Sequence, residues 1–396
     1  MVEVVADAEW EAMQHFVSNS PWDSSGLLRQ LRDEVNQELG GTADSCLLVD
    51  ESAFNKKGEA SVGVARQWNG RLGKTDNCQV GVFGALASCT KVTLTDARLY
   101  LPKTWTKDTA RCEKAGVPEA ERHYRSKVDL ALEIVSTAQE QKMDFHWVGA
   151  DSFYGRDRHF RDTLAQRGLT YMVDIPANTH LYLQDPKPCV PARRAKKGRA
   201  PKRLQASTTS VQLDQWLAEQ PETAFRWLTL RQGSKGALRV KVLQRLVWLW
   251  DHESPQAERV HLIVAIQGRK KQKIKYSVSN AHPDTPVERL ASMQAQRYWV
   301  ERALQDAKSE AGMADYQVRG WRAWHHHMAM VMLAMLFMLQ IKNKHGDEYQ
   351  LLTAADIRTL LQFFLPKRDI TVEEVIQQLK IRHDKRKKDI DLHRKT

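Results

Sequence analysis

The chain has 396 residues, with 42% hydrophobic and 27% charged side chains, a composition that is typical of globular proteins and excludes a disordered chain. This length is enough for a sizeable core and for two or three structural units. The formal net charge of +12 favours a polyanionic partner such as DNA, RNA or an acidic membrane, although a merely basic, soluble surface would carry the same charge.

The N-terminal part of the sequence predicts helices followed by strands. Its first residues are acidic and lack the apolar segment of a signal peptide. Residues 7–40 have the spacing of two amphipathic helical segments, which Gly40 and Gly41 end. Short β-type runs, separated by Gly, Asn and Lys turns, then follow at 45–50, 60–68, 78–88 and 91–101.

Helices and strands alternate in the next part of the chain. The expected order is helix 127–139, strand 145–151, helix 156–167 and strand 170–175. Strands that are followed by such an alternation predict an α/β fold, in which a mixed sheet is flanked by helices.

The alternation stops after Pro176. Residues 187–203 are rich in proline and basic side chains, and they predict an exposed, flexible loop. Strand-like runs return at 225–230, 237–250, 260–267 and 274–279, so 177–280 is predicted as a mainly β insertion. The rest is expected to be helical, and its most apolar stretch, 328–341, is too short for a membrane span of about 20 residues and predicts a buried core helix.

Two aspartates directly follow apolar, strand-like runs. Asp50 closes the run 46–50, and Asp151 closes the run 146–151. A carboxylate in this position is held rigidly at the rim of the core, where it can bind a hard cation. Two-metal phosphoryl-transfer enzymes need such a cluster, because ions about 3.5–4 Å apart must contact both the attacking and the leaving oxygen.

A third acid, Glu301, lies on a predicted helix. Thr285 can cap its start, Pro286 suits its first turn, Glu288 would complete a capping box, and Gly312 would end it.

On such a helix Arg297, Glu301 and Lys308 fall within about 40° of one face. The alternative is a solvated stripe with one ion pair, worth about 0.3–0.5 kcal/mol. Taken alone, the stripe is the better interpretation, but beside two strand-end aspartates the functional site is preferred.

The motifs resemble those of the DDE transposases of bacterial insertion sequences, in particular the branch with a β-strand insertion between the second and third acids. The resemblance covers about residues 10–345 and implies an RNase H-like catalytic domain. It rests on Glu301 and Lys308 and on the segments 47–58, 63–68, 76–82, 150–155 and 318–321.

The resemblance implies that Asp50, Asp151 and Glu301 are the catalytic metal ligands for two Mg²⁺ ions, which Mn²⁺ can replace. It also implies that Arg297 and Lys308 contact DNA phosphates near the scissile bond. The sequence departs from the family at two points. Gln294 stands where many members have tyrosine, and only about 49 residues precede the first acid, fewer than a full end-recognition domain has.

Further DNA contacts are expected outside the acidic cluster. A basic loop and the run 269–275 can follow the DNA backbone, although a solvated turn has the same composition. Lys56 and Lys57 follow the first acid closely, and Tyr276 can stack on an unpaired base, although most strand aromatics are packing residues. The basic loop side chains are Arg193, Arg194, Lys196, Lys197 and Arg199.

The sequence predicts five regions. They are a helical N-terminal segment at 1–41, a catalytic core at 42–176 and 281–345, the β insertion at 177–280 and a helical basic tail at 346–396. His325, His326 and His327 are expected on a helix surface, because consecutive helical residues point in different directions and cannot chelate one ion together.

The function expected from these features is metal-dependent cleavage and strand transfer of insertion-sequence ends, that is, a cut-and-paste DNA transposase. A homodimer on two DNA ends is expected from the family. Five cysteines without a C-x-x-C pair indicate reduced thiols in a cytoplasmic protein. The resemblance implies a bacterial protein that associates with the nucleoid, and no membrane partner is expected.

Three alternatives remain open. One is a transposase-derived nuclease that has lost end recognition, and another is an inactive relative that only binds DNA. The third is glycoside hydrolysis by paired carboxylates, which leaves the net charge of +12 unexplained.

Overall fold

The computed structural model describes residues 9–70, 72–192, 201–233, 236–268, 272–346, 348–349, 352–364 and 371–393. The chain forms two units, of which the larger spans Trp22–Leu352 and the smaller combines Met1–Pro21 with Thr353–Thr396. The smaller unit holds the helices α1 (Trp10–Ser18), α12 (Ala354–Phe364) and α13 (Val372–His393). The larger unit holds the sheet and the candidate site.

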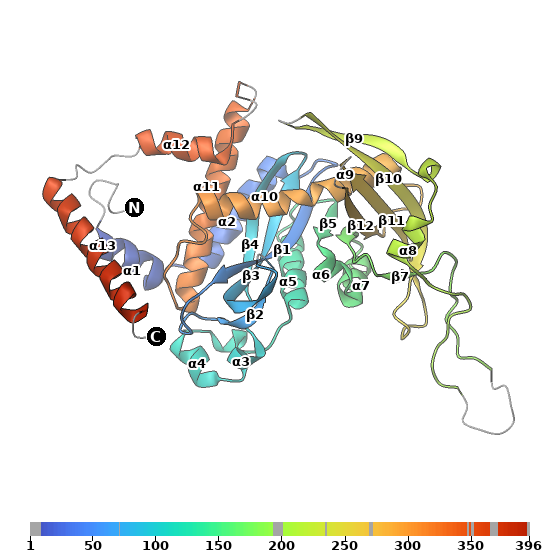
Figure 1. Ribbon diagram of the computed structural model, residues 1–396, viewed down its shortest axis with the longest axis horizontal. Coiled ribbons are helices and arrows are strands. Elements are labelled where there is room, and N and C mark those ends of the chain that lie inside the picture. Colours follow the sequence, from blue (N-terminus) through green and yellow to red (C-terminus); the bar gives the residue numbers. More distant parts are fainter. Residues whose placement is uncertain are drawn as a thin grey trace. The chain divides into compact units, whose positions relative to one another are not determined.

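The larger unit is built on a ten-stranded sheet with the order β2-β3-β1-β5-β6-β12-β11-β10-β9, in which β4 also pairs with β3 (Figure 1). Most of these strands lie where the sequence predicts them, because their apolar and β-branched runs end at turn residues. The strands are β1 (Cys46–Asn55), β2 (Ala65–Asn69), β3 (Lys74–Ser88), β4 (Lys91–Leu99), β5 (Trp147–Ala150), β6 (Thr170–Asp174), β9 (Arg226–Gly233), β10 (Gly236–Leu249), β11 (Glu258–Gln267) and β12 (Lys273–Ser279).

The strand directions bring the two aspartates to one edge. The strand β1 is antiparallel to β3 but parallel to β5, and Val49 pairs with Ala150. The residues that follow, Asp50 and Asp151, therefore lie next to each other in the register. The prediction that Asp50 ends its strand is wrong, because β1 stays paired with β3 as far as Asn55. Asp50 is instead the first residue of β1 that has no partner on β5, because β5 ends at Ala150.

The insertion extends the same sheet. Its strand β12 pairs antiparallel with β6, and β11, β10 and β9 follow in antiparallel order. It also contains the small ladder of β7 (His180–Leu181) with β8 (Val211–Gln212) and the helix α8 (Leu213–Ala218). The predicted fold class, a mixed sheet flanked by helices with a mainly β insertion, is confirmed. The five predicted region boundaries remain predictions.

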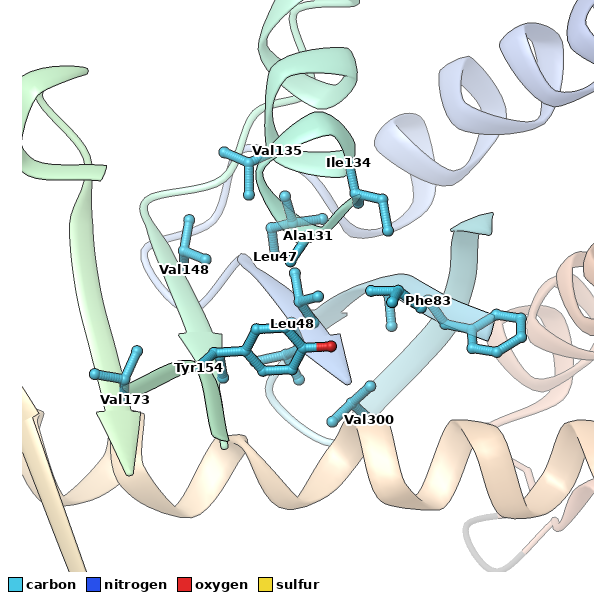
Figure 2. Close-up of a cluster of buried hydrophobic side chains, with 14 of the residues drawn as sticks. Leu47, Leu48, Phe83, Ala131, Ile134, Val135, Val148, Tyr154, Val173 and Val300 are labelled. Carbon is cyan, nitrogen blue, oxygen red and sulfur yellow. The ribbon is translucent and has the colours of Figure 1, made fainter. Parts of the chain in front are cut away.

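Helices pack on both faces of the parallel strands. Figure 2 shows α5 (Lys127–Glu140) on one side, with Ala131 and Val135 above Leu47, and Val300 of α10 (Tyr298–Glu310) on the other. All four side chains are at most 1% exposed, and burying a leucine or valine stabilises the fold by about 1.5–3 kcal/mol. The helix α5 begins with a complete capping box formed by Ser126 and Asp129.

The other helices of the larger unit are shorter, apart from α2 and α11. The sequence did not predict α3, α4 and α8, which are only four to six residues long. The remaining α-helices and the two short 3₁₀ helices, η1 and η2, have the following bounds: α2 (Ser24–Leu39), α3 (Lys103–Thr106), α4 (Thr109–Lys114), η1 (Glu119–Glu121), α6 (Ser152–Gly155), α7 (Arg158–Gln166), η2 (Glu222–Ala224) and α11 (Trp321–His345).

The helix α11 is long and apolar enough to cross a membrane by length and composition, but more than half of its apolar stretch is buried inside the structure. This burial agrees with the predicted core helix. The expectation that the histidine triplet lies on the surface is wrong for His326, which is 1% exposed. Its ring stacks on Trp22 at 3.8 Å, and its Nε2 lies 2.9 Å from the Trp22 carbonyl oxygen.

The predicted helix of the third acid is divided into two. The helix α9 spans Val287–Gln296, and α10 spans Tyr298–Glu310, with Arg297 between them. The predicted capping box with Thr285 and Glu288 is wrong, because Pro286 holds the cap position and no side chain caps the helix. Arg297 itself has helical backbone angles, with φ −54° and ψ −28°, and its side chain is buried.

Candidate active site

A cavity of about 1390 Å³ lies at the edge where β5 and β6 end. Five residues that the sequence selects for the chemistry line this cavity: Asp50, Asp151, Arg297, Glu301 and Lys308. They come from β1, from the residue after β5, and from the broken helix α9–α10. The larger unit therefore brings together residues that are up to 258 positions apart, from Asp50 to Lys308.

Asp50 is held by its own strand. Its Oδ1 accepts a hydrogen bond from the Glu51 backbone N–H at 2.7 Å. Desolvation by the surrounding protein raises the pKa of the Asp50 carboxyl, and the negative charge of Asp151 raises it further, while Arg297 acts in the opposite direction. The positive charge of Arg297 therefore does not fully compensate an ionised Asp50 carboxylate.

Asp151 is held by the start of α6. Its Oδ1 accepts hydrogen bonds from the backbone N–H groups of Phe153, at 2.9 Å, and Tyr154, at 3.4 Å. Desolvation also raises the pKa of Asp151, and the Arg297 charge and these hydrogen bonds oppose that shift. The following Gly155 lets α6 approach β6, because a Cβ atom there would lie 1.9 Å from the Asp174 carbonyl oxygen.

Arg297 is the buried cation of the site, with a side chain that is 8% exposed. Its Nε lies 2.6 Å from Asp174 Oδ2, and its Nη2 donates to Glu301 Oε1 at 2.7 Å. Burial lowers the pKa of Arg297, but Asp174, Glu301 and Asp50 together raise it more, so the net shift is upward. The guanidinium therefore stays charged.

Glu301 is the third acid of the cavity, and its carboxylate is turned toward Arg297. Within the described parts of the chain, no three His, Cys, Asp or Glu side chains already stand close enough to hold a metal ion. For Glu301 to share a cation with the two aspartates, its carboxylate would have to leave the Arg297 guanidinium.

Glu51 and Asp174 also line the cavity, and the sequence analysis did not select Asp174. It is the last residue of β6, the strand next to β5. The pattern that selects Asp50 and Asp151, an acid that closes a run of apolar residues, also occurs here, because Asp174 follows the run 171–173. The signal was therefore present in the sequence.

Basic and aromatic side chains form the rest of the rim. Lys127 lies 2.9 Å from the Glu51 carboxylate, and Lys308 Nζ lies 5.3 Å from the centre of the Phe54 ring. Arg156 and Trp68 also line the cavity, and the Trp68 side chain is 56% exposed. A cationic rim around an acidic floor suits an anionic polymer that must approach a metal site.

Of the other predicted DNA contacts, those that lie in the described part of the chain do not line the cavity. Lys56 Nζ lies 3.6 Å from the centre of the Tyr316 ring, and desolvation lowers the pKa of Lys56 to about 8. Lys57 is exposed, and Tyr276 is half-buried on β12 against the core. The basic loop residues Arg193, Arg194, Lys196, Lys197 and Arg199 lie outside the described residues.

The floor of the cavity fits a hard divalent cation. Asp50 and Asp151 present oxygen ligands, which Mg²⁺ and Mn²⁺ prefer. Both carboxyl groups have raised pKa values because of desolvation, and repulsion between the two contributes at Asp50. A cation between them would relieve this repulsion, because Arg297 alone does not offset the rise in the two pKa values.

Compared with known proteins, the chain matches a family model described as "DDE superfamily endonuclease" over residues 1–237. This region contains Asp50 and Asp151 but ends before Glu301. A curated relative from Microchaete diplosiphon, "Probable transposase for insertion sequence element IS701", is 30% identical over 184 residues. That match covers 46% of this chain and 44% of the relative, so it spans less than half of either protein.

Proposed function

The chain belongs to the DDE superfamily of endonucleases, and we propose that it is a DNA transposase that cuts the ends of an insertion sequence and joins them to target DNA. The observation that carries this proposal is the shared cavity of Asp50, Asp151 and Glu301, with Arg297 and Lys308 beside them. The partial likeness to a probable insertion-sequence transposase supports the same conclusion.

Endonucleases of this superfamily generally depend on divalent metal, and we propose two Mg²⁺ ions, replaceable by Mn²⁺, held by Asp50, Asp151 and Glu301. Bound there, such ions supply an activated attacking oxygen and charge stabilisation for the leaving oxygen. The protein's own contribution is to hold two carboxylates rigidly through the β1–β5 register and the α6 cap.

The cations of the site bind and orient the DNA. Arg297 and Lys308 are proposed to contact phosphates on either side of the scissile bond, since charge-assisted contacts to phosphate fix the register of a duplex. Lys127 and Arg156 extend the basic rim. Each phosphate that the protein neutralises steepens the salt dependence of binding by about 0.9 log units per log unit of salt.

Binding to two DNA ends as a homodimer, in the cytoplasm and at the nucleoid of a bacterium, completes the proposal. In it, residues 1–41 and the basic loop Arg193–Arg199 are further DNA-binding regions. The role of residues 1–41 rests on the family alone, because this segment carries more acidic than basic side chains. The role of the loop rests on its positive charge.

A cleavage assay on labelled duplexes, with and without the inverted repeats of the element, tests the proposal. We expect Mg²⁺-dependent nicking at the repeat ends and strand transfer of the 3′ ends, both abolished in Asp151→Asn. The matched control is Asp33→Asn, an exposed aspartate on α2. Unchanged cleavage in Asp151→Asn contradicts the site, and cleavage without joining favours the second candidate, a nuclease, which agrees with the endonuclease family.

A further inference from the structure

A chain of four polar contacts connects the insertion to the third acid. Gln294 Nε2 donates to Ser277 Oγ at 2.8 Å, and the Ser277 hydroxyl donates to Asp174 Oδ1 at 2.5 Å. The second oxygen of Asp174 pairs with Arg297 Nε at 2.6 Å, and Arg297 Nη2 donates to Glu301 at 2.7 Å. Residues from β12, β6 and the α9–α10 helix therefore act as one unit.

The members of this chain differ in how freely they can move. Gln294 and Ser277 are at most 2% exposed. The side chains of Arg297 and Asp174 are 8% and 14% exposed, whereas that of Glu301 is 48% exposed. Of the three charged groups, Glu301 is thus the one with room to rotate away from the guanidinium.

Rotation of Glu301 has a cost that depends on Asp174. A buried guanidinium that loses its carboxylate partner is strongly destabilised. With Asp174 present, Arg297 keeps one close ion pair when Glu301 leaves. Without Asp174, Glu301 would be the remaining directly paired carboxylate of Arg297, and its departure would leave the buried guanidinium without a direct ion pair.

We propose that Asp174 is a positioning residue that keeps Arg297 paired, so that Glu301 can move from the guanidinium to the metal. This inference rests on the proposed function, because it requires Glu301 to be a metal ligand. Ser277 and Gln294 fix the Asp174 carboxylate in the orientation that Arg297 needs. The register places Ser277 of β12 opposite Asp174 of β6, so the insertion takes part in building the catalytic site.

The test measures Mn²⁺ binding to the full chain without DNA, by the electron paramagnetic resonance signal of free Mn²⁺. Asp174→Asn is expected to weaken binding by about tenfold, as for other residues that support metal ligands. Arg297→Gln releases Glu301 and is expected to bind Mn²⁺ at least as tightly as the wild type. In the Arg297→Gln background, Asp174→Asn is expected to have no further effect.

The double variant separates positioning from a direct role. An equal loss from Asp174→Asn in both backgrounds would mean that Asp174 binds the metal or acts through its charge alone, and the inference fails. It also fails if Asp174→Asn binds as the wild type does. The matched control, Asp162→Asn, removes another arginine-paired aspartate on α7 and is expected to leave binding unchanged.

Two further variants keep the result interpretable. Glu301→Gln is expected to weaken Mn²⁺ binding, and a wild-type chain without saturable binding contradicts the metal site itself rather than the role of Asp174. If Asp174→Asn does not fold, Ser277→Ala replaces it, because it keeps every charge and removes only the hydroxyl that orients Asp174. It is expected to weaken Mn²⁺ binding less than Asp174→Asn and only when Arg297 is present, and wild-type binding in Ser277→Ala overturns the inference.

Discussion

The two halves of the candidate site are built by different means. Asp50 and Asp151 are fixed by the backbone, through the register of two parallel strands and a helix cap. Glu301 sits on α10, half exposed, and is held by one side chain, Arg297. In the proposed site two ligands are therefore rigid and the third is held by an arginine, because repulsion between carboxylates acts at Asp50, whereas pairing with Arg297 acts at Glu301.

The largest expected effect is at the rigid half. Asp50→Asn should reduce Mg²⁺-dependent cleavage by about 10³-fold, because metal-centred charge stabilisation is worth several kcal/mol and each 1.4 kcal/mol is tenfold in rate. Without metal at pH 8, its unfolding temperature should not fall, because the neutral amide removes repulsion with Asp151 and a desolvated charge. Single-turnover cleavage and thermal unfolding measure both, and a clear loss of stability would contradict the electrostatic account.

The packing of α6, which holds Asp151, can be disturbed without changing any acidic side chain. Gly155→Ala should destabilise the fold by about 3 kcal/mol, since overpacking costs about 1–3 kcal/mol and the added Cβ meets a backbone oxygen. Denaturant unfolding measures the loss. The matched control is Gly58→Ala, which should be nearly neutral because Gly58 has open space around it. Gly168 would be unsuitable because its φ is positive.

Removing the charge of Glu301, the movable acid of the site, should change the stability of the protein in the opposite direction to Asp50→Asn. Glu301→Gln should lower the free energy of unfolding in the absence of metal by about 1 kcal/mol, because Arg297 loses a partner that is itself half exposed to solvent. Urea unfolding of Glu301→Gln and Asp50→Asn at neutral pH compares the two changes in the free energy of unfolding directly. Equal signs for the two variants would remove the distinction between the halves.

The smallest expected effect is at the rim. Lys308→Ala should weaken DNA binding only a few-fold and reduce the slope of log affinity against log salt by about 0.9, the value of one phosphate contact. Fluorescence anisotropy over a salt series measures this slope. Lys57→Ala is the matched control if DNA follows the cavity, since Lys57 is exposed but does not line it. An equal slope change in both variants would mean that the rim does not select the DNA path.

Much of the fold and the rigid half of the site follow from local patterns. Asp50 and Asp151 can be found because apolar strand runs end in an acid, and Asp174 follows by the same rule. The ion pair between Asp174 and Arg297 depends on packing between residues 123 positions apart, so no local pattern predicts it.

Two further differences between the predicted and the observed structure also arise from packing between residues that are distant in the sequence. The burial of the Arg297 guanidinium could not be predicted, because it depends on packing against Asp174 of β6, a strand far away in the sequence. His326 was misplaced for a similar reason, since its partner Trp22 comes from the other end of the larger unit.

The central claim is that Asp50, Asp151 and Glu301 together hold divalent ions. Anomalous diffraction at the manganese edge, from crystals of the chain with Mn²⁺ and a DNA duplex, tests it most directly. We predict manganese between Asp50 and Asp151, with the Glu301 carboxylate bound to metal and separated from Arg297. Manganese bound elsewhere, or a Glu301 carboxylate still paired with Arg297 beside an occupied site, would contradict the claim.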